Sequence, residues 1–471
     1  MLLENGRAME FLNIEKYTYL EEKHRGYLDQ LKDFCKKSPR LPRYHIHPPC
    51  GLLNDPNGLC YFEGKYHVFY QWFPFAPKHG MKHWAHVISE DLVHWEWSEE
   101  MLVPDHEFEK NGCYSGNSIE AGGKQYLFYT ANYKTKQGKV PKQALAVMEK
   151  YGKIHKYSGN PVIDGAPEGM SGEIRDPFVF EKDDSYYMML GGSDLDGTGQ
   201  ILIYKSADLL SWDYRGNLDL GRQDLGTMFE CPAYMEIDGK DVLLLSLIGR
   251  AAQEERFQNE FSTVCFTGRI DLEKLTFETE TMEELDKGFD FYAPQMFCGK
   301  GGRPLMFGWF GCGVQELPYF REDMWQHALT LPREICIKDG RLYQMPAQEI
   351  ISQFSALDIK RGQIIIPEEN AWRLHLTSDT ECKTEIHIGE SYDHLKIVMD
   401  PIKRQFIADR SCLKQKISEE YGTRRVCPLD THKSVEVDLY YDNTFLEIYI
   451  DGGKDVMSLR LFPESYKVEM I

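Results

Sequence analysis

The sequence contains neither a metal-binding cysteine pattern nor a hydrophobic run long enough to cross a membrane. Its 12 cysteines are scattered and none forms a Cys-x-x-Cys pair, so we predict neither a zinc site nor a disulfide framework. Cysteines without such a framework are typical of a reducing compartment. No run of about 18 apolar residues is present, which argues against a membrane-spanning helix. These absences favour a cytoplasmic protein without a membrane partner.

Two further signals are missing near the N-terminus. Residues 1–7 lead into charged sequence without an apolar core or a small-residue cleavage site, so we expect no signal peptide. His45 and His47 could face the same side of a strand, but no third ligand stands out. We therefore predict no metal site.

Positive charge is scarce relative to negative charge. The chain has 54 Lys and Arg residues against 74 Asp and Glu residues, which gives a formal net charge of −20. Such a charge disfavours broad binding to nucleic acids or anionic membranes. It permits a small anionic substrate, provided that basic side chains gather in one pocket.

Between residues 50 and 345 the sequence has little helical periodicity and many short β-like runs. Apolar cores recur about every 60 residues, at 68–70, 127–129, 187–190, 242–245 and 305–309. A second strand-like run follows each core. Repeats of this length, each with about four short strands, predict a five-bladed β-propeller rather than a solenoid or a sandwich.

The flanking sequence predicts three further parts. Apolar residues recur with helical spacing over 9–36, which predicts an amphipathic helix within an N-terminal segment, 1–39. The propeller would cover 40–345, and a linker would follow over 346–356. Alternating strands and hairpin turns predict a β-sandwich over 357–471. The predicted fold class is all-β, a five-bladed propeller followed by a C-terminal sandwich.

Short motifs before the apolar cores carry the candidate chemistry. In a propeller the first strand of each blade lines the central axis, so these motifs should converge there. They are Asn54-Asp55-Pro56, Tyr114-Ser115-Gly116, Arg175-Asp176-Pro177, Glu230-Cys231-Pro232 and Tyr292-Ala293-Pro294. Acidic residues and prolines could simply mark turns at blade entrances. Three carboxylates in phase with the repeat, Asp55, Asp176 and Glu230, favour a shared site instead.

Three carboxylates without metal ligands are typical of glycoside hydrolysis. In the retaining mechanism one carboxylate attacks the anomeric carbon, and another group gives a proton to the leaving oxygen. The acid must keep its proton near neutral pH, which burial and neighbouring negative charge favour. Glu230 suits the acid and Asp55, on an expected turn, suits the nucleophile. Asp176 lies next to Arg175, which should keep it ionised so that it stabilises developing positive charge.

With these motifs the chain resembles glycoside hydrolase family 32, the β-fructofuranosidases, whose fold is a five-bladed propeller followed by a β-sandwich. The resemblance is strong over about 40–345 and weaker beyond. It is carried by residues 54–58, 175–177 and 230–231, with supporting matches at 69–71, 84–86, 114–116, 291–294 and 329–334.

The resemblance implies a role for each site residue. Asp55 would be the nucleophile that forms a fructosyl-enzyme, Glu230 the acid/base and Asp176 the transition-state stabiliser, without a cofactor. The side chains that would bind substrate are Asn54, Gln71, His79, Tyr114, Ser115, Arg175 and, as a possible wall of the site, Trp309. Gln71 could also be a strand-end amide and Tyr114 a core residue.

Residues 73–84 are similar to the bacterial sucrose-6-phosphate hydrolases within the family. Lys78, His79, Lys82 and His83 form a basic cluster there, which could bind phosphate, although a solvated loop would equally explain the two lysines. Leu52 and His79 stand where many members have Trp, so the fructose pocket should be less aromatic.

We therefore expect hydrolysis of sucrose 6-phosphate to glucose 6-phosphate and fructose. One alternative is the same chemistry on unphosphorylated sucrose or short fructans. Another is a non-catalytic carbohydrate-binding propeller, against which the complete set of three carboxylates argues. A third alternative is phosphoryl or nucleotide chemistry. The sequence lacks the glycine-rich phosphate loop between a strand and a helix that such chemistry would need.

Overall fold

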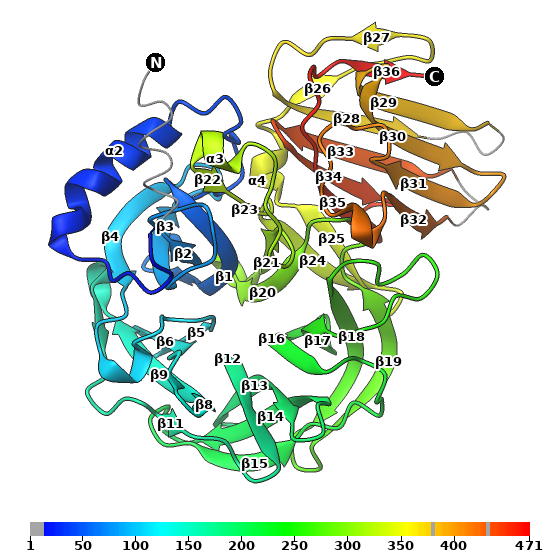
Figure 1. Ribbon diagram of the computed structural model, residues 1–471. Helices are drawn as coiled ribbons and strands as arrows, with labels where there is room; N and C mark the ends of the chain where they lie inside the picture. Colours follow the sequence, from blue (N-terminus) through cyan, green and yellow to red (C-terminus); the bar gives the residue numbers. More distant parts are fainter. Residues whose placement is uncertain (1–13, 378–381, 430–433) are drawn as a thin grey trace.

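The computed structural model describes residues 14–377, 382–429 and 434–471, and it is built mainly of antiparallel β-sheets. Successive sheets over 51–346 lie around a central opening, and residues 355–470 form two further sheets beside them (Figure 1). In each sheet around the opening, an early strand lies innermost. Segments far apart in the sequence therefore meet at the opening.

The sheets around the opening follow the order of the chain. The first contains β22 (Trp325–Gln326), β1 (Gly51–Phe62), β2 (Lys65–Phe73), β3 (His83–Ser89) and β4 (Glu96–Leu102). The second contains β5 (Ser118–Ala121), β6 (Lys124–Thr130), β9 (Lys142–Met148), β10 (Ile154–Lys156) and β11 (Ile163–Asp164). The third contains β12 (Met170–Lys182), β13 (Ser185–Asp194), β14 (Gly199–Ser206) and β15 (Asp213–Asn217).

Two more sheets complete this part. The fourth contains β16 (Met228–Ile237), β17 (Lys240–Ile248), β18 (Phe261–Asp271) and β19 (Thr276–Glu284). The fifth contains β20 (Tyr292–Cys298), β21 (Pro304–Phe310), β23 (Ala328–Leu329), β24 (Arg333–Lys338) and β25 (Arg341–Pro346). A short hairpin outside these sheets joins β7 (Lys134–Thr135) to β8 (Gly138–Lys139).

The C-terminal part is a β-sandwich. One sheet contains β26 (Ser355–Leu357), β28 (Ala371–Thr377), β33 (Glu436–Asp442), β34 (Phe445–Ile450) and β35 (Asp455–Arg460). The other contains β27 (Ile364–Ile365), β36 (Val468–Met470), β29 (Thr384–Glu390), β30 (Asp393–Asp400), β31 (Gln405–Asp409) and β32 (Arg424–Pro428). Alternate residues of both sheets, such as Trp372, Ile397 and Ile448, share one buried cluster. The sandwich predicted after the linker is therefore present.

Helices are few among the described residues. They are α2 (Arg25–Cys35), α3 (Phe320–Asp323) and α4 (Gln348–Ile351), together with five short 3-10 segments, Glu22–His24, Glu107–Glu109, Lys150–Gly152, Lys300–Gly302 and Glu419–Tyr421. α2 buries Leu28 and Leu31 in the same cluster as Tyr70 of β2. No helix in the described ranges combines the length and hydrophobicity that a membrane crossing would require.

The helix predicted over 9–36 is shorter than expected. Residues before 14 lie outside the described residues, and residues 14–21 are not helical. The carbonyl of Lys16 accepts a hydrogen bond from the backbone of Met81 at 2.7 Å. This carbonyl is therefore used by the loop before β3 rather than by a following helical turn.

Buried charges join the fifth sheet to the sandwich. Arg333 on β24 is fully buried, and its guanidinium donates to Glu447 of β34 at 2.7 Å and to Asp286 at 3.2 Å. Ser458 of β35 donates to the same oxygen of Asp286 at 2.6 Å. Partners on both sides of the buried arginine tie the two parts together.

The sandwich also holds the segment that leads into β1. The backbone N–H groups of Arg43, Tyr44 and His45 donate to the Asp442 carboxylate at 2.7, 2.8 and 3.1 Å. The ring of His45 lies between Asp442 and Glu447, at 2.8 and 3.1 Å. His45 therefore has a structural role in the domain junction.

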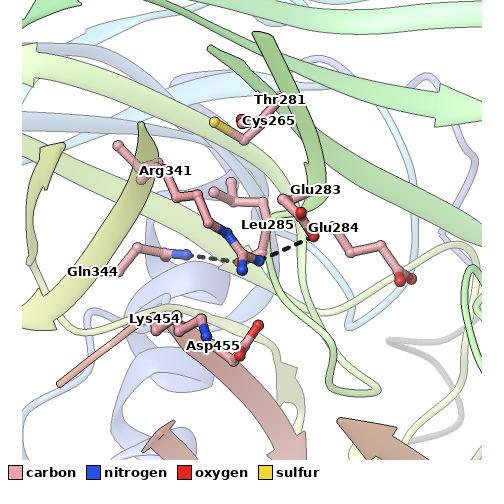
Figure 2. Close-up of a pocket in the computed structure, with 10 residues that line it drawn as sticks. Cys265, Thr281, Glu283, Glu284, Leu285, Arg341, Gln344, Lys454 and Asp455 are labelled. Atoms are coloured by element: carbon pink, nitrogen blue, oxygen red, sulfur yellow. Dashed lines mark hydrogen bonds and ion pairs between the residues drawn. The ribbon is translucent and has the colours of Figure 1, made fainter. Parts of the chain in front are cut away.

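A small pocket lies at the junction (Figure 2). Its volume is about 20 Å³, and its walls come from β18, β19, β25 and β35. Arg341 pairs with Glu283 at 3.2 Å, and Gln344 donates to the carbonyl of Leu285 at 2.7 Å. The pocket has room for about one water molecule. No predicted site residue lines it, so it belongs to the domain junction.

Candidate active site

Bulges in the innermost strands shape the region around the central opening. The pairing register shifts at the predicted motifs of β1, β12, β16 and β20, between Leu53 and Pro56, Arg175 and Phe178, Glu230 and Ala233, and Tyr292 and Gln295. Within three bulges the residue before proline has positive φ, namely 63° at Asp176, 45° at Cys231 and 48° at Ala293. Bulges change the direction of side chains, and unusual φ values gather at functional sites.

Asp55 lies in β1 and not on the expected turn. Its side chain is half-buried, and each carboxylate oxygen accepts a hydrogen bond. Asn54 donates to Oδ1 at 2.9 Å, and Ser115 donates to Oδ2 at 2.5 Å. Burial raises the pKa of Asp55, while these two bonds oppose the rise.

A chain of polar side chains surrounds Asp55. Lys82 donates to Oδ1 of Asn54 at 2.5 Å. Asn54 donates to Oε1 of Gln71 at 2.6 Å, and Gln71 donates to the Ser115 hydroxyl at 2.6 Å. The structure therefore brings together Asn54, Gln71 and Ser115, as the sequence predicted, and adds Lys82.

Cys231 lies between the carboxylates of Asp55 and Asp176. Its backbone N–H donates to Oδ2 of Asp176 at 3.0 Å, and its Sγ lies 3.5 Å from the same oxygen. The same Sγ lies 4.0 Å from Oδ2 of Asp55. Glu230 precedes Cys231 directly in β16. One thiol therefore contacts both aspartates and adjoins the glutamate.

Glu230 is held by partners from two other sheets. Arg175 donates from Nε to Oε1 at 2.8 Å, and the Tyr292 hydroxyl donates to Oε2 at 2.7 Å. Arg175 also binds Glu173 at 2.5 Å. The carboxylate is thus fixed at both oxygens.

The expected environment of Asp176 needs correction. Arg175 forms its hydrogen bonds with Glu230 and Glu173, and none of the described bonds joins it to Asp176. Burial and the negative charge of Glu230 raise the pKa of Asp176, although the Arg175 charge opposes this. Arg175 therefore favours the ionised form of Asp176 through its charge and not through a hydrogen bond, and the ionisation of Asp176 stays a prediction.

Family models match nearly the whole described chain. Residues 45–346 match the N-terminal domain of glycosyl hydrolases family 32, and residues 347–470 match its C-terminal domain. The chain belongs to glycoside hydrolase family 32. The all-β propeller-and-sandwich fold of the family is therefore the fold of this chain as well.

Relatives and solved structures support this membership. The sucrose-6-phosphate hydrolase of Vibrio alginolyticus is 33% identical over 98% of this chain and 94% of the relative. That of Bacillus subtilis strain 168 is 32% identical over 94% of each. The structure of sucrose-6-phosphate hydrolase from Lactobacillus gasseri has a TM-score of 0.87 at 30% identity and covers 97% of this chain and 95% of that one. A mutant Bombyx mori family 32 β-fructofuranosidase in complex with sucrose has a TM-score of 0.83 at 29% identity, with 95% of each chain covered.

The aromatic residues predicted for the family 32 site lie near Glu230. Trp309 is buried, and its ring centre lies 6.5 Å from that of Tyr292 and 6.0 Å from that of His79. Tyr114 is half-buried next to Ser115. The wall position of Trp309 stays a prediction.

The basic cluster predicted at 78–83 does not form one phosphate pocket. Lys78 donates to the carbonyl of Ile14 at 3.0 Å, whereas Lys82 is directed toward Asn54. His83 is fully buried. Lys78 thus points to the N-terminal segment, whereas Lys82 and His79 lie together next to Asn54.

Sequence reasoning missed two contacts of this site. Tyr292 was quoted only as part of a motif, yet it binds Glu230, and Glu173 binds Arg175. The repeat contained a signal for Tyr292, because Asn54, Arg175 and Glu230 occupy the same place two residues before a proline. The sequence contains no such signal for Glu173, because its contact with Arg175 depends on how β12 bends.

One group outside this site has the spacing of cation ligands. Asp105, His106 and Glu109 bring their ligand atoms within 4.8 Å of one another. Lys156 already donates to Asp105 at 2.5 Å and also pairs with Glu109. The ammonium therefore balances this acidic group.

Proposed function

We propose that this family 32 chain is a retaining β-fructofuranosidase that hydrolyses sucrose 6-phosphate to glucose 6-phosphate and fructose. The observation that carries the proposal is the position of Cys231, which contacts Asp55 and Asp176 and follows Glu230. Three carboxylates from three separate sheets thus gather around one small side chain. Retaining glycosidases need such a group of carboxylates on both sides of the scissile bond.

Asp55 is the proposed nucleophile. Its carboxylate attacks the anomeric carbon of the fructosyl unit, and the bond to the leaving oxygen breaks as the ester to Asp55 forms. Burial raises its pKa, which makes the carboxylate a stronger base and nucleophile. Hydrogen bonds from Asn54 and Ser115 hold both oxygens in place.

Glu230 is the proposed acid/base. It gives a proton to the glycosidic oxygen in the first step and takes one from water in the second, in which water cleaves the fructosyl ester. Arg175 and Tyr292 orient its two oxygens. Asp176 binds sugar hydroxyls and stabilises the oxocarbenium-like transition state when ionised. No step needs a cofactor.

Sucrose 6-phosphate is the proposed substrate because curated relatives that align over nearly the full chain carry that activity in their names. The phosphate lies on the glucosyl leaving group, which is the side of Glu230. There Lys139 of β8 donates to Glu173 at 2.5 Å, and Glu173 binds Arg175. We infer that Lys139 supplies positive charge to the phosphate in place of the loop at 78–83.

The test compares fructose release from sucrose 6-phosphate and from sucrose, with Asp55→Asn as the blank. We expect a large preference for sucrose 6-phosphate and no release by Asp55→Asn. Lys139→Met should raise KM for the phosphorylated sugar alone, whereas Lys136→Met on the same hairpin is the matched control. Equal rates on both sugars would refute the phosphate preference. Full activity of Asp55→Asn would refute the mechanism.

We also propose finer features of the fold and location. The sheets would form a five-bladed propeller over 40–345, closed by the parallel pairing of β22 with β1, after an N-terminal segment, 1–39. A linker, 346–356, would lead to the sandwich, 357–471. Free cysteines, of which the buried Cys50 and Cys231 are examples, support a cytoplasmic location.

A further inference from the structure

Lys82 is buried behind the proposed nucleophile, and none of the steps above uses it. Its exposed fraction is only 4%, and its Nζ lies 2.5 Å from Oδ1 of Asn54. The other hydrogen-bond partner is Nδ1 of His79, at 3.2 Å. Lysine is among the residues that are almost never buried without a partner. A buried ammonium at this place therefore indicates a specific role.

The surroundings of Lys82 make its charge costly. Burial lowers the pKa of Lys82 to about 7, the nearby Asp55 charge opposes this, and the charge of Lys16 adds to it. Burial and the Lys82 charge also lower the pKa of His79 well below its usual range. His79 therefore stays neutral and accepts a hydrogen bond from Lys82 through Nδ1.

Lys82 determines which way the neighbouring amides point. An ammonium group can donate hydrogen bonds but cannot accept them. When Lys82 is protonated, which the nearby Asp55 charge favours, Asn54 must turn its carbonyl oxygen toward Lys82 and its NH₂ group toward Gln71 and Asp55, as the hydrogen bonds show. Gln71 accepts with Oε1, so its own NH₂ group is left to donate to Ser115.

The direction of this relay reaches Asp55 from two sides. Ser115 has a single hydroxyl hydrogen, and because Gln71 donates to its oxygen, that hydrogen is available for Oδ2 of Asp55. Asn54 provides the hydrogen bond to Oδ1. If the Asn54 amide turned over, its carbonyl would face the Asp55 carboxylate and repel it. Hydrogen bonds to a carboxylate are strong, so losing them would misplace the nucleophile.

We propose that Lys82 is a positioning residue that fixes the direction of the Asn54, Gln71 and Ser115 relay and thereby holds Asp55 ready for attack. This inference rests on the proposed function of Asp55 as nucleophile. The relay surrounds the nucleophile and not the leaving group. Its effect is therefore the same for sucrose 6-phosphate and for sucrose.

The first experiment replaces Lys82 and measures kcat and KM on both sugars. Lys82→Met removes the donor, and we expect kcat to fall about 100-fold on each sugar while KM changes less than about threefold. Lys82→Gln can still donate to Asn54 and should recover at least about tenfold of that loss. Lys78→Met, from the same loop, is the matched control and should keep the wild-type kcat. A KM increase for sucrose 6-phosphate alone would assign Lys82 to phosphate binding and overturn the relay.

The second experiment is a double-mutant cycle with Asn54→Ala. If Lys82 acts through Asn54, Lys82→Met should change kcat less than about threefold in the Asn54→Ala background. An undiminished loss in that background would mean that Lys82 acts directly by its charge, and the relay would be wrong. Should Lys82→Met fail to fold, the same cycle with Lys82→Gln decides the matter.

Failure of the relay and failure of the proposed function give different results. If the wild-type protein released no fructose, or if Asp55→Asn remained active, the proposed function would be refuted. If the wild-type protein is active, Asp55→Asn is inactive and Lys82→Met keeps full kcat, then only the relay is refuted.

Discussion

The guanidinium of Arg175 and the carboxylate of Glu230 are joined at 2.8 Å, although the two residues lie in different sheets. The bond uses Nε of Arg175 and leaves the second carboxylate oxygen to the Tyr292 hydroxyl. Arg175 therefore orients the proposed acid rather than the neighbouring Asp176. The position of the Glu230 carboxylate is set jointly by β12, β16 and β20.

Tyr292→Phe should slow the reaction when the leaving group needs a proton. The variant frees one oxygen of Glu230 to rotate. We expect kcat on sucrose 6-phosphate to fall about 10- to 100-fold, which is part of the roughly 100- to 10,000-fold that general acid–base catalysis contributes. A β-fructofuranoside with a nitrophenol leaving group needs little proton donation and should lose less than about fivefold. Equal losses on both substrates would show that Tyr292 does not act through Glu230.

Gly116→Ala should disturb the site through the backbone. A Cβ at Gly116 would lie 1.9 Å from the carbonyl oxygen of Phe128, so the chain next to Ser115 must move. We expect at least about a 100-fold loss of kcat, since a displacement near 1 Å has that effect, or loss of folded protein by circular dichroism. Gly26→Ala is the control, because a Cβ there meets nothing within 4 Å and lies in α2. It should keep full activity and add about 0.5–1 kcal/mol of stability.

Arg333→Met should destabilise the junction between propeller and sandwich. The substitution leaves Asp286 and Glu447 buried without their cation, and removing one partner of such a pair costs about 3–5 kcal/mol. We expect a lower urea midpoint, with both parts unfolding in one transition. Arg341→Met removes a partly exposed pair with Glu283 at the same junction and should change the midpoint little. A midpoint unchanged in Arg333→Met would contradict the importance of the buried network.

Stability should fall in acid because of Glu447. Burial alone would raise the pKa of Glu447, but the Arg333 charge and the His45 hydrogen bond lower it to about 2. A depressed carboxylate pKa adds stability above the unfolded value, and that contribution disappears as the pH falls through the folded value. The shift from 4.5 to about 2 corresponds to roughly 3 kcal/mol.

Urea unfolding at pH 6 and pH 3 measures this contribution. Wild-type protein should lose part of its free energy of unfolding between these values, and Glu447→Gln should lose about 2 kcal/mol less, because pH 3 is still above the folded pKa of about 2. The same loss in both proteins would assign the acid sensitivity to other carboxylates whose pKa is lowered in the fold, such as Glu173 and Glu385.

Much of the architecture could be predicted because strands and turns are local. The repeat of apolar cores located the sheets, and the phase of Asp55, Asp176 and Glu230 predicted that they meet. The partners of Arg175 and Lys82 could not be predicted, because they depend on bulges and on the path of a loop between sheets. The prediction of a helix over 14–21 was wrong for the same reason, because the carbonyl of Lys16 accepts a hydrogen bond from the backbone of Met81, which is distant in sequence.

The hydrogen bonds from Arg43, Tyr44 and His45 to Asp442 have a consequence for biosynthesis. Asp442 is 399, 398 and 397 residues from these three partners. The segment that leads into β1 therefore cannot form its final contacts until almost the entire chain has left the ribosome. The first sheet therefore lacks these hydrogen bonds while the later sheets are synthesised. Once Asp442 has been synthesised and β33 has formed, its carboxylate binds the segment before β1 to the C-terminal sandwich. A truncated chain lacking β33 would therefore lose the contacts that anchor the segment before Asp55.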